Sequence, residues 1–353
     1  MSWRISDDIS VRASEQTAVK APDIGQLFQP QLTSYAFARP DPCDFRYRGT
    51  GRAPDVRERN CLAEGLAPDF VSQAVNASVQ GLSGGNPNLE NEVADTESIG
   101  LIYQPSWFAD VLVGDLSFSA DYIKINLDDY ITSFTLGQNL IACYDFEDYP
   151  NRYCNNFRRD ADGQIVYWEA GLVNAGLIEF ATYVWNADYL VDASELVSFI
   201  SRNNVATDLG SIAVRWRAYQ QVYFKDAASG DPDDLEDTTG EFGNDEWFYD
   251  TTIEYRYNDF YAYLVGNSRS GGKINAFQQY DDQYLDLDGN PISEFKGYTF
   301  WNAGFGYQVN DGLSLRLIFN NVMDYDGTED VFTREADIVS VGRTVTAGFN
   351  WRF

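Results

Sequence analysis

The feature that most constrains this sequence is an alternation of apolar and polar side chains with a period of two residues. At the C-terminus, the odd positions from 341 to 353 are apolar except for Arg343, while the even positions are polar or glycine. Successive side chains of a β-strand point to opposite faces, so the pattern indicates a strand with one apolar and one polar face. About ten segments show this pattern, and most approach the roughly 9–11 residues with which a tilted strand crosses a bilayer.

The connections between these segments alternate between short and long. The short connections are 106–110, 258–259 and 310–312. The long connections are about 17–94, 134–172, 226–244, 271–296 and 325–338. Short periplasmic turns and long extracellular loops are typical of outer-membrane barrels.

Two short helices are expected within the connections. Asp192 and Glu195 have the spacing of a capping box ahead of an apolar stretch, which predicts a helix in the connection 192–207. A second helix is expected in the first long loop, near 67–77.

These observations predict an all-β chain that forms an antiparallel transmembrane β-barrel section of about ten strands. The alternative is a soluble β-sandwich, whose strands also alternate. The barrel is favoured because the Trp and Tyr residues of the apolar positions concentrate near the strand ends, as in an interfacial aromatic girdle. No run of apolar residues is long enough for a transmembrane helix.

Composition excludes several functions. The chain contains no histidine, so a Ser-His-Asp triad, a Cys-His pair and a His-ligated zinc site are impossible. Its formal net charge of −29 disfavours nucleic acid as a partner. No paired catalytic carboxylates and no phosphate-binding glycine loop stand out, so we expect neither an enzyme nor a cofactor.

The four cysteines form two pairs that are close in sequence, Cys43 with Cys61 and Cys143 with Cys154. Neither pair has the Cys-x-x-Cys spacing of a redox or zinc motif. Two loop-closing disulfides in an oxidising compartment are favoured, with free thiols as the alternative. The N-terminal residues lack the apolar segment of a signal peptide. The cysteines indicate an exported protein, whereas the N-terminus carries no export signal, so we expect a fragment of a longer protein.

Charged residues at polar strand positions are candidates for a barrel lumen, where they must be paired or hydrated. These candidates are Arg12, Arg215, Arg217, Glu254, Arg256 and Arg316. Tyrosines of the long loops could stack on a ligand, or could serve only to order the loops. The tyrosine candidates are Tyr144, Tyr149, Tyr153, Tyr280 and Tyr284.

Two acidic turns have the form Asp-x-Asp-Gly, at 160–163 and 286–289. Alternating carboxylates followed by glycine can bind Ca²⁺, but neither turn completes the twelve-residue pattern. Solvated loop turns are therefore favoured, and no metal site is predicted.

Three motifs resemble the C-terminal part of TonB-dependent outer-membrane receptors. The first runs from Lys20 through Ala-Pro-Asp-Ile-Gly-Gln to Leu27, and the second from Gly85 through Asn-Pro-Asn-Leu to Glu90, with Gly100 in the strand that follows. The third joins Asn320-Asn-Val-Met-Asp to a later Gly-Arg-Thr and a terminal Phe353. The first two depart from the family pattern, at Lys20, Asp23 and Gln26 and at Glu90-Asn91.

The resemblance implies a section of a plugged barrel of about 22 strands. Residues 1–353 would supply about the last ten strands and no plug domain, so the chain alone would not be transport-competent. The implied location is the outer membrane of a Gram-negative cell, in contact with membrane lipid and lipopolysaccharide. The implied partners are the TonB energy-coupling complex, through the absent N-terminal region, and the barrel-assembly machinery, through Phe353.

The implied function is active uptake of a scarce solute, such as a siderophore or an oligosaccharide. The strongly acidic composition favours a neutral or cationic ligand over an anionic chelate. A stand-alone small barrel acting as an adhesin or binding scaffold is the alternative.

Overall fold

Long antiparallel strands form one continuous sheet in this chain. The computed structural model describes residues 1–51, 53–227, 235–241, 243–273, 294–325 and 342–352. Within these residues, the main path of the sheet follows the order β1-β2-β5-β6-β8-β9-β11-β12-β15-β16-β17. Each long strand therefore pairs with the long strand that precedes it in the sequence, as in a β-meander.

Ten long strands carry this path within the described part of the chain. They are β2 (Ile9–Lys20), β5 (Glu92–Tyr103), β6 (Asp115–Ser133), β8 (Ile165–Asp192), β9 (Ser211–Ala227), β11 (Trp247–Tyr257), β12 (Phe260–Arg269), β15 (Tyr298–Asn310), β16 (Leu313–Asn320) and β17 (Thr344–Trp351). The short β1 (Ser2–Arg4) adds to the N-terminal edge. The expectation of about ten antiparallel strands is confirmed.

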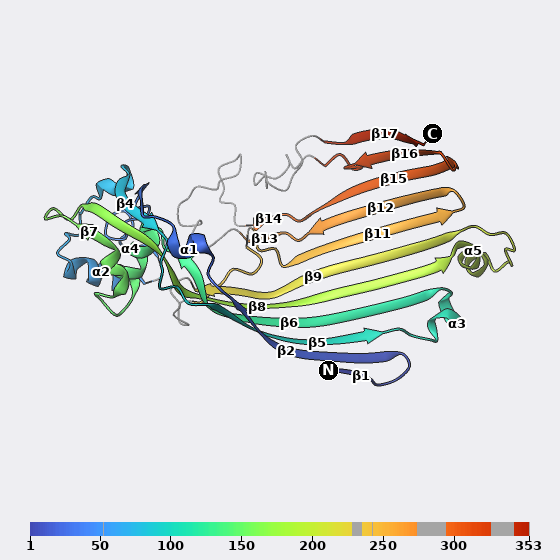
Figure 1. Cartoon of the computed structure of the whole chain (residues 1–353), viewed down its shortest axis with the longest axis horizontal. Coiled ribbons are helices and arrows are strands. Elements are labelled where there is room, and N and C mark those ends of the chain that lie inside the picture. Colours follow the sequence, from blue (N-terminus) through green and yellow to red (C-terminus); the bar gives the residue numbers. More distant parts are fainter. Residues whose placement is uncertain (52, 228–234, 242, 274–293, 326–341, 353) are drawn as a thin grey trace.

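The sheet is a curved band with two edges. Within the described residues, β1 pairs only with β2, and β17 pairs only with β16. Figure 1 shows the N-terminus at one edge of the band and the C-terminus at the other.

The strand register gives the sheet one apolar and one polar face. Directly paired residues of an antiparallel sheet share a face. One such row runs Leu101, Ala120, Trp185, Ala218 and Tyr249 across five neighbouring strands. We call the face with this row the apolar face and the opposite one the polar face.

The apolar face leaves many large side chains exposed. Leu101, Phe305 and Phe349 are 41%, 41% and 71% exposed. Within the described residues, no second sheet packs on this face. The described part of the sheet thus lacks the buried interface of a β-sandwich, which argues against the sandwich alternative.

The first two long loops fold together into a compact unit, which we call the loop lobe (residues 21–91 and 134–172). Figure 1 shows it at one end of the sheet. It contains α1 (Ile24–Phe28), β3 (Leu32–Ala36), α2 (Pro54–Ala63), η1 (Gln73–Val75), β4 (Val79–Gly84), α4 (Leu136–Asp145), η2 (Arg152–Asn156) and β7 (Phe157–Arg159). The start of β8 joins the two loops, because it pairs in parallel with β4 and in antiparallel with β7.

The main hydrophobic core lies inside this lobe and not against the sheet. Its fully buried side chains include Leu136, Leu140 and Tyr144. Two disulfides staple the lobe, Cys43–Cys61 and Cys143–Cys154, in the local pairs that the sequence suggested. Each disulfide closes a loop within one of the two long connections.

The remaining short strands lie near the loop ends of the later strands. β10 (Glu236–Asp237) extends the sheet beside β9, and β13 (Gly272–Lys273) pairs with β14 (Glu294–Phe295).

The opposite end of the sheet carries two helices. α5 (Ala193–Ser201) begins after Asp192, whose side chain accepts hydrogen bonds from the backbone N–H groups of Ser194 and Glu195. This helix was expected. α3 (Phe108–Leu112) occupies a connection that was expected to be a plain short turn. None of the described helices is long and apolar enough to cross a membrane.

The prediction of a helix near 67–77 was wrong. Only the short 3₁₀ turn Gln73–Val75 forms there, and the α-helices of this loop lie earlier, at Ile24–Phe28 and Pro54–Ala63. Pro54 suits the first turn of a helix, where a missing N–H costs nothing. Gly65, with φ of +90°, follows the end of that helix and stops it from continuing.

Candidate functional site

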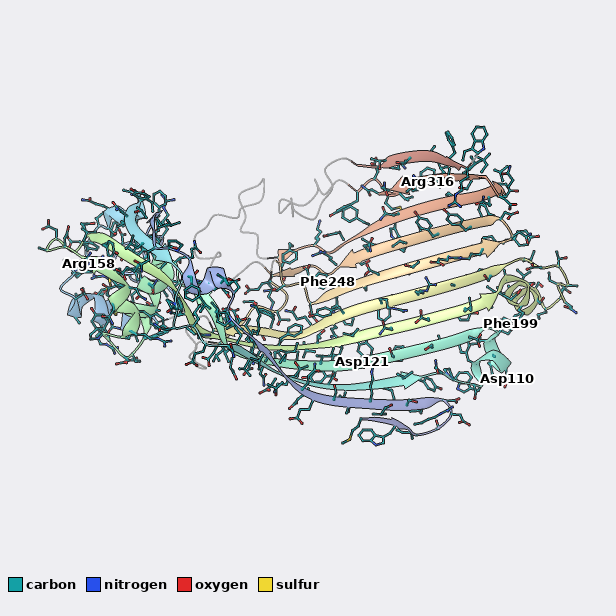
Figure 2. All side chains as sticks on the ribbon, viewed as in Figure 1. Asp110, Asp121, Arg158, Phe199, Phe248 and Arg316 are labelled. Atoms are coloured by element: carbon teal, nitrogen blue, oxygen red, sulfur yellow. A yellow bond between two sulfur atoms is a disulfide. The ribbon has the colours of Figure 1, made fainter. Side chains whose placement is uncertain are left out.

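All six charged residues proposed for the lumen lie on the polar face of the sheet. The pairing register places Arg215 opposite Asp188 and Arg217 opposite Asn186, on one side of β9. The same side continues through Glu254 and Arg256 on β11 to Arg316 on β16. In the other direction it continues to Arg12 on β2. Figure 2 shows two members of this face, Asp121 and Arg316, on well-separated strands.

Most of these charges are paired sideways along the sheet. Arg217 donates to Asp188 at 2.7 Å, and Arg215 donates to Glu254 at 2.9 Å. Glu254 also lies 3.4 Å from Arg256. These charges are therefore balanced within the sheet, by contacts between neighbouring strands and, for Glu254 and Arg256, within one strand.

Arg316 differs from the others. Among the described residues it has no ion-pair partner, and it lies across Gly348 of the neighbouring strand. Its guanidinium is therefore available to a carboxylate or a phosphate from outside the sheet.

The pair formed by Arg12 and Asp121 spans three strands. Arg12 is on β2 and Asp121 is on β6, and Gly100 of β5 lies between them in the same row. The guanidinium reaches over the glycine and donates two hydrogen bonds to the carboxylate, at 2.7 and 2.6 Å. A Cβ at Gly100 would collide with the Asp121 carboxylate and press on Arg12. Because Gly100 has no side chain, it leaves the space in which Arg12 of β2 reaches Asp121 of β6.

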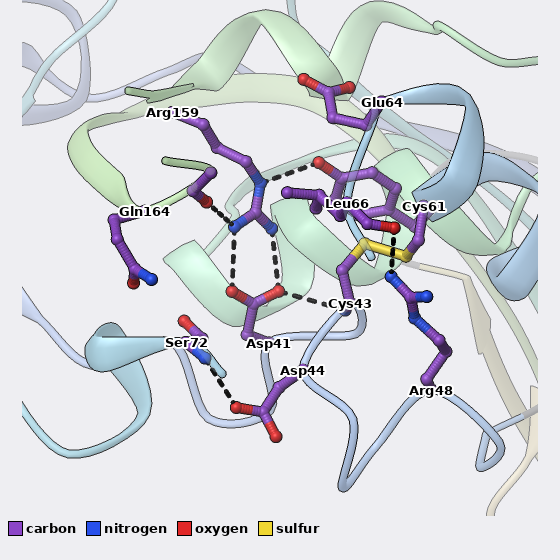
Figure 3. Close-up of polar contacts among 12 residues, drawn as sticks. Asp41, Cys43, Asp44, Arg48, Cys61, Glu64, Leu66, Ser72, Arg159 and Gln164 are labelled. Carbon is purple, nitrogen blue, oxygen red and sulfur yellow. Dashed lines mark hydrogen bonds and ion pairs between the residues drawn. A yellow bond between two sulfur atoms is a disulfide. The ribbon is translucent and has the colours of Figure 1, made fainter. Parts of the chain in front are cut away.

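A buried ion pair holds the two long loops of the lobe together. Arg159 donates to both carboxylate oxygens of Asp41, at 2.8 and 3.1 Å, across a sequence separation of 118 residues. Their side chains are only 4% and 0% exposed. Arg159 also donates to the Tyr144 hydroxyl and to the carbonyl of Gly163. Figure 3 shows this guanidinium surrounded by its partners beside the Cys43–Cys61 disulfide.

A second buried pair joins the same two loops at their helices. Arg57 of α2 donates to Asp145 of α4 at 2.6 Å, and both side chains are less than a tenth exposed. Nearby, the Asn60 side chain donates to the backbone carbonyl of Tyr144 at 2.9 Å. Covalent bonds thus close each loop on itself, whereas ion pairs and hydrogen bonds connect one loop to the other.

Burial shifts the ionisation of the groups in this network. It raises the pKa of the Tyr144 hydroxyl to about 12, against the opposing influence of the Arg159 charge. Burial alone would lower the pKa of Arg159, but the charge and hydrogen bonds of Asp41 raise it. Arg159 therefore stays charged and Tyr144 stays neutral at ordinary pH.

The described loop tyrosines do not form an exposed surface on which a ligand could stack. Tyr144 and Tyr153 are 0% and 5% exposed and belong to the lobe core. Tyr149 is half-buried, and its hydroxyl donates to Glu64. In this arrangement these side chains order the loops, which was the alternative role. Tyr280 and Tyr284 lie outside the described residues, as does Phe353.

The acidic turn at 160–163 is closed by its own backbone. Asp160 accepts hydrogen bonds from the backbone N–H groups of Asp162 and Gln164. This is the geometry of an Asx turn at a loop tip.

Sequence reasoning missed two exposed pairs of arginine and aromatic residues on the lobe. The guanidinium of Arg39 lies 4.6 Å from the ring centroid of Phe37, and that of Arg46 lies 5.7 Å from Phe45. Phe37 and Phe45 are 47% and 53% exposed. Arg46 is also bound to the buried Asp44, whereas no described carboxylate pairs with Arg39. The spacing Phe37-Ala-Arg39 could have indicated the first pair, because residues two apart share a side of an extended segment.

Comparisons with known proteins agree with this architecture. The family model described as TonB dependent receptor-like, beta-barrel matches residues 1–322. A search of curated proteins with the sequence returned no match.

Two solved structures illustrate the likeness in fold. The siderophore receptor PirA from Acinetobacter baumannii has a TM-score of 0.54 at 12% identity, over 100% of this chain and 40% of its own. A mutant of the ferric enterobactin receptor PfeA from Pseudomonas aeruginosa, in complex with enterobactin, has a TM-score of 0.52 at 11% identity. That match covers 99% of this chain and 39% of the receptor. The chain thus spans about two fifths of the length of these receptors.

Replacing Asp41 with Asn should destabilise the lobe by about 3–5 kcal/mol, because Arg159 would keep its charge in a buried site without a counter-charge. Hydrogen exchange followed by mass spectrometry would show faster exchange in α2 and α4 and unchanged exchange in β15 and β16.

The matched control is Glu147→Gln. Glu147 also forms an ion pair between the two loops, with Arg59, but the side chains of Arg59 and Glu147 are 54% and 76% exposed. The loss of stability in this variant should therefore stay below about 1 kcal/mol. Equal effects of the two variants would contradict the assigned role of the buried pair.

Gly100→Ala should destabilise the sheet by roughly 1–3 kcal/mol, because the added methyl group displaces the carboxylate that binds Arg12. The urea midpoint of the protein in detergent measures this loss. Gly171→Ala on β8 is the control, since nothing lies within 4 Å of its added Cβ. A further Asp121→Ala substitution removes the colliding atoms, so it should cost little more in the Gly100→Ala background. Full additivity of the two substitutions would argue against the bridge.

Proposed function

Because this chain belongs to the TonB-dependent receptor-like β-barrel family, we propose that it forms part of the wall of an outer-membrane receptor for a scarce solute. The family consists of transport receptors and not of enzymes. The observation that carries the proposal is the two-faced sheet, which exposes Leu101, Phe305 and Phe349 on one side and ion-paired charges on the other. A membrane-spanning wall needs this combination, with lipid outside and a hydrated lumen inside.

The apolar face would contact the lipid and lipopolysaccharide of a Gram-negative outer membrane. Every backbone group within the hydrocarbon layer needs a partner, and the antiparallel pairing supplies partners throughout the interior of the sheet. The two edge strands would pair with further strands of the same barrel. This fits a chain that covers 39–40% of the receptors it resembles.

The polar face would border the plug of the complete receptor. Arg316 supports this assignment, because it projects from that face without an ion-pair partner among the described residues. Energy coupling through TonB and insertion by the barrel-assembly machinery would be properties of the whole receptor.

We propose that the loop lobe contributes to capture of a ferric siderophore. The exposed Phe37–Arg39 pair supports an anionic aromatic chelate, since a guanidinium stacked on an aromatic ring offers both charge and a flat apolar surface. This choice departs from the expectation based on the net charge of −29. A net charge describes the long-range field, whereas contact with a ligand depends on the local group.

The membrane assignment predicts a difference between two adjacent residues of β16. Leu317→Arg puts a charge on the apolar face near the strand centre and should cost about 2–4 kcal/mol in a bilayer. Ile318→Arg puts the same charge on the polar face and should cost much less. The amount of each variant assembled in the outer membrane measures the effect. Equal losses for both variants would contradict a lipid-facing apolar face.

The ligand assignment predicts that Phe37→Ala combined with Arg39→Ala in the complete receptor weakens ferric siderophore binding by about tenfold or more, because the bound chelate would lose a cation–π surface that it covers and shields from water. Titration of cells or of the purified receptor with ferric catecholate and hydroxamate chelates would measure it. Arg158→Ala, which removes a similar stacked arginine at the far tip of the lobe, should leave binding unchanged. Unchanged binding by the double variant would argue against this ligand surface.

A further inference from the structure

A row of aromatic residues marks the end of the apolar face opposite to the loop lobe. Each long strand that runs toward this end carries a Tyr or Trp near its last residue. They are Tyr103 on β5, Tyr189 on β8, Tyr257 on β11, Tyr307 on β15 and Trp351 on β17. Their pairing partners, which include Phe118, Val214, Phe260 and Leu315, place all five on the apolar face. Aromatic rings of this kind concentrate at the boundary between hydrocarbon and headgroups.

The connection that contains α3 is attached to this row. The indole N–H of Trp107 donates to the Tyr103 hydroxyl at 2.9 Å. The ring of Phe108 packs edge-on against Tyr189 at 5.8 Å between centroids. The Tyr189 hydroxyl donates to the carbonyl of Val113 at 3.1 Å. Three contacts therefore hold α3 at the level of the aromatic row, against the apolar side of the sheet.

The attached turn exposes a group of large apolar side chains. Trp107, Val111 and Leu112 are 48%, 57% and 43% exposed. Trp107 and Val111 are four residues apart, so they lie on the same side of the helical turn. A connection that faced only water would gain nothing from exposing these three side chains together.

α5 repeats this feature at the same end of the sheet. Val197, Phe199 and Ile200 are 41%, 47% and 71% exposed. Figure 1 shows α3 and α5 at the ends of neighbouring strands, and Figure 2 labels Asp110 and Phe199 on them. The strands between them are β6 and β8, which pair directly.

We propose that α3 and α5 are interfacial anchors that lie in the headgroup boundary of the phospholipid leaflet at the turn end of the sheet. This inference rests on the proposed membrane-spanning function. The lipid surface is the chosen occupant because α3 is held against the aromatic row of the apolar face, and α5 exposes side chains of the same kind at the same end of the sheet. Apolar side chains on a short interfacial helix gain free energy when they enter the boundary between headgroups and acyl chains.

The charges of the two helices specify the type of lipid contact. α3 contains one charged residue, Asp110, and α5 contains one, Glu195; neither helix contains Lys or Arg. An anchor that used anionic lipid would need basic residues near the surface. Arg202 at the C-cap of α5 is the nearest basic residue in the sequence of either helix, so these anchors act mainly through apolar contact, bind a zwitterionic leaflet and depend little on salt. They fix the depth of the strand ends of β5, β6, β8 and β9 in the membrane.

Depth-dependent fluorescence quenching tests the proposal. Single cysteines replace Val111 and Ile200 in the full-length protein, carry a bimane label, and are reconstituted with the native disulfides intact in phosphatidylcholine vesicles. Some vesicles contain lipid with a nitroxide near the headgroup, and others contain lipid with a nitroxide deep in the acyl chain. Phe305→Cys on the apolar face is the hydrocarbon control, and Leu62→Cys on α2, which is 48% exposed, is the water control.

We expect the shallow nitroxide to quench the labels at Val111 and Ile200 at least about twofold more than the deep nitroxide, because the anchors lie in the boundary region. The deep nitroxide should dominate at Phe305, and neither should act on Leu62. Quenching at Val111 and Ile200 should persist in 1 M salt, on the order of ten times physiological ionic strength.

Three outcomes would overturn the anchor. If labels at Val111 and Ile200 behave like the one at Leu62, the helices face water. If they are shielded from aqueous iodide but not quenched by lipid, a protein partner or a second copy covers them. If Phe305 also escapes quenching, the membrane-spanning function itself fails and the anchor fails with it, whereas quenching at Phe305 alone rejects only the anchor.

Discussion

The register of the backbone hydrogen bonds is the constraint on which the rest of this structure depends. Side chains alternate between the two faces of a strand, so a slip of one residue would move charged groups such as Arg12, Arg217 and Glu254 to the apolar side. The rows that run from Leu101 to Tyr249 and from Arg12 to Asp121 both exist only because the strands that they cross keep matching registers. The separation of an apolar from a polar surface is therefore a property of backbone pairing.

The polar face shows how such a register is reinforced. Opposite charges on directly or diagonally paired residues, such as Arg217 and Asp188, stabilise the observed register of the strands and would be separated in a shifted one. Gly100 extends this principle over a longer range, because the absence of a side chain lets Arg12 reach past its neighbouring strand. The charges of this face are largely balanced within it, whereas Arg316 has no ion-pair partner among the described residues.

The loop lobe is stabilised in a different way from the sheet. The sheet exposes apolar residues on a broad face, whereas the lobe has a compact core with Leu136, Leu140 and Tyr144 completely or almost completely buried. Disulfides restrict each loop, and the buried pairs Arg159–Asp41 and Arg57–Asp145 connect them. A lobe of this kind holds its surface residues, including Phe37 and Arg39, in defined positions above the sheet end.

The sequence by itself determined the strands, the alternation of their faces, the placement of all six candidate charges on one face, and the helix after Asp192. Each of these follows from a local period or from residues within one turn of one another. Only the tertiary structure decided that Tyr144 and Tyr153 are core residues, that α2 lies at Pro54–Ala63, and that α3 bends against Tyr103 and Tyr189. Those outcomes depend on contacts between segments as far as 118 residues apart, as between Asp41 and Arg159, and such contacts leave no periodic signal in either segment. The sequence around a loop tyrosine does not show whether its side chain faces a ligand or a core, because this depends on how the other loop packs against it.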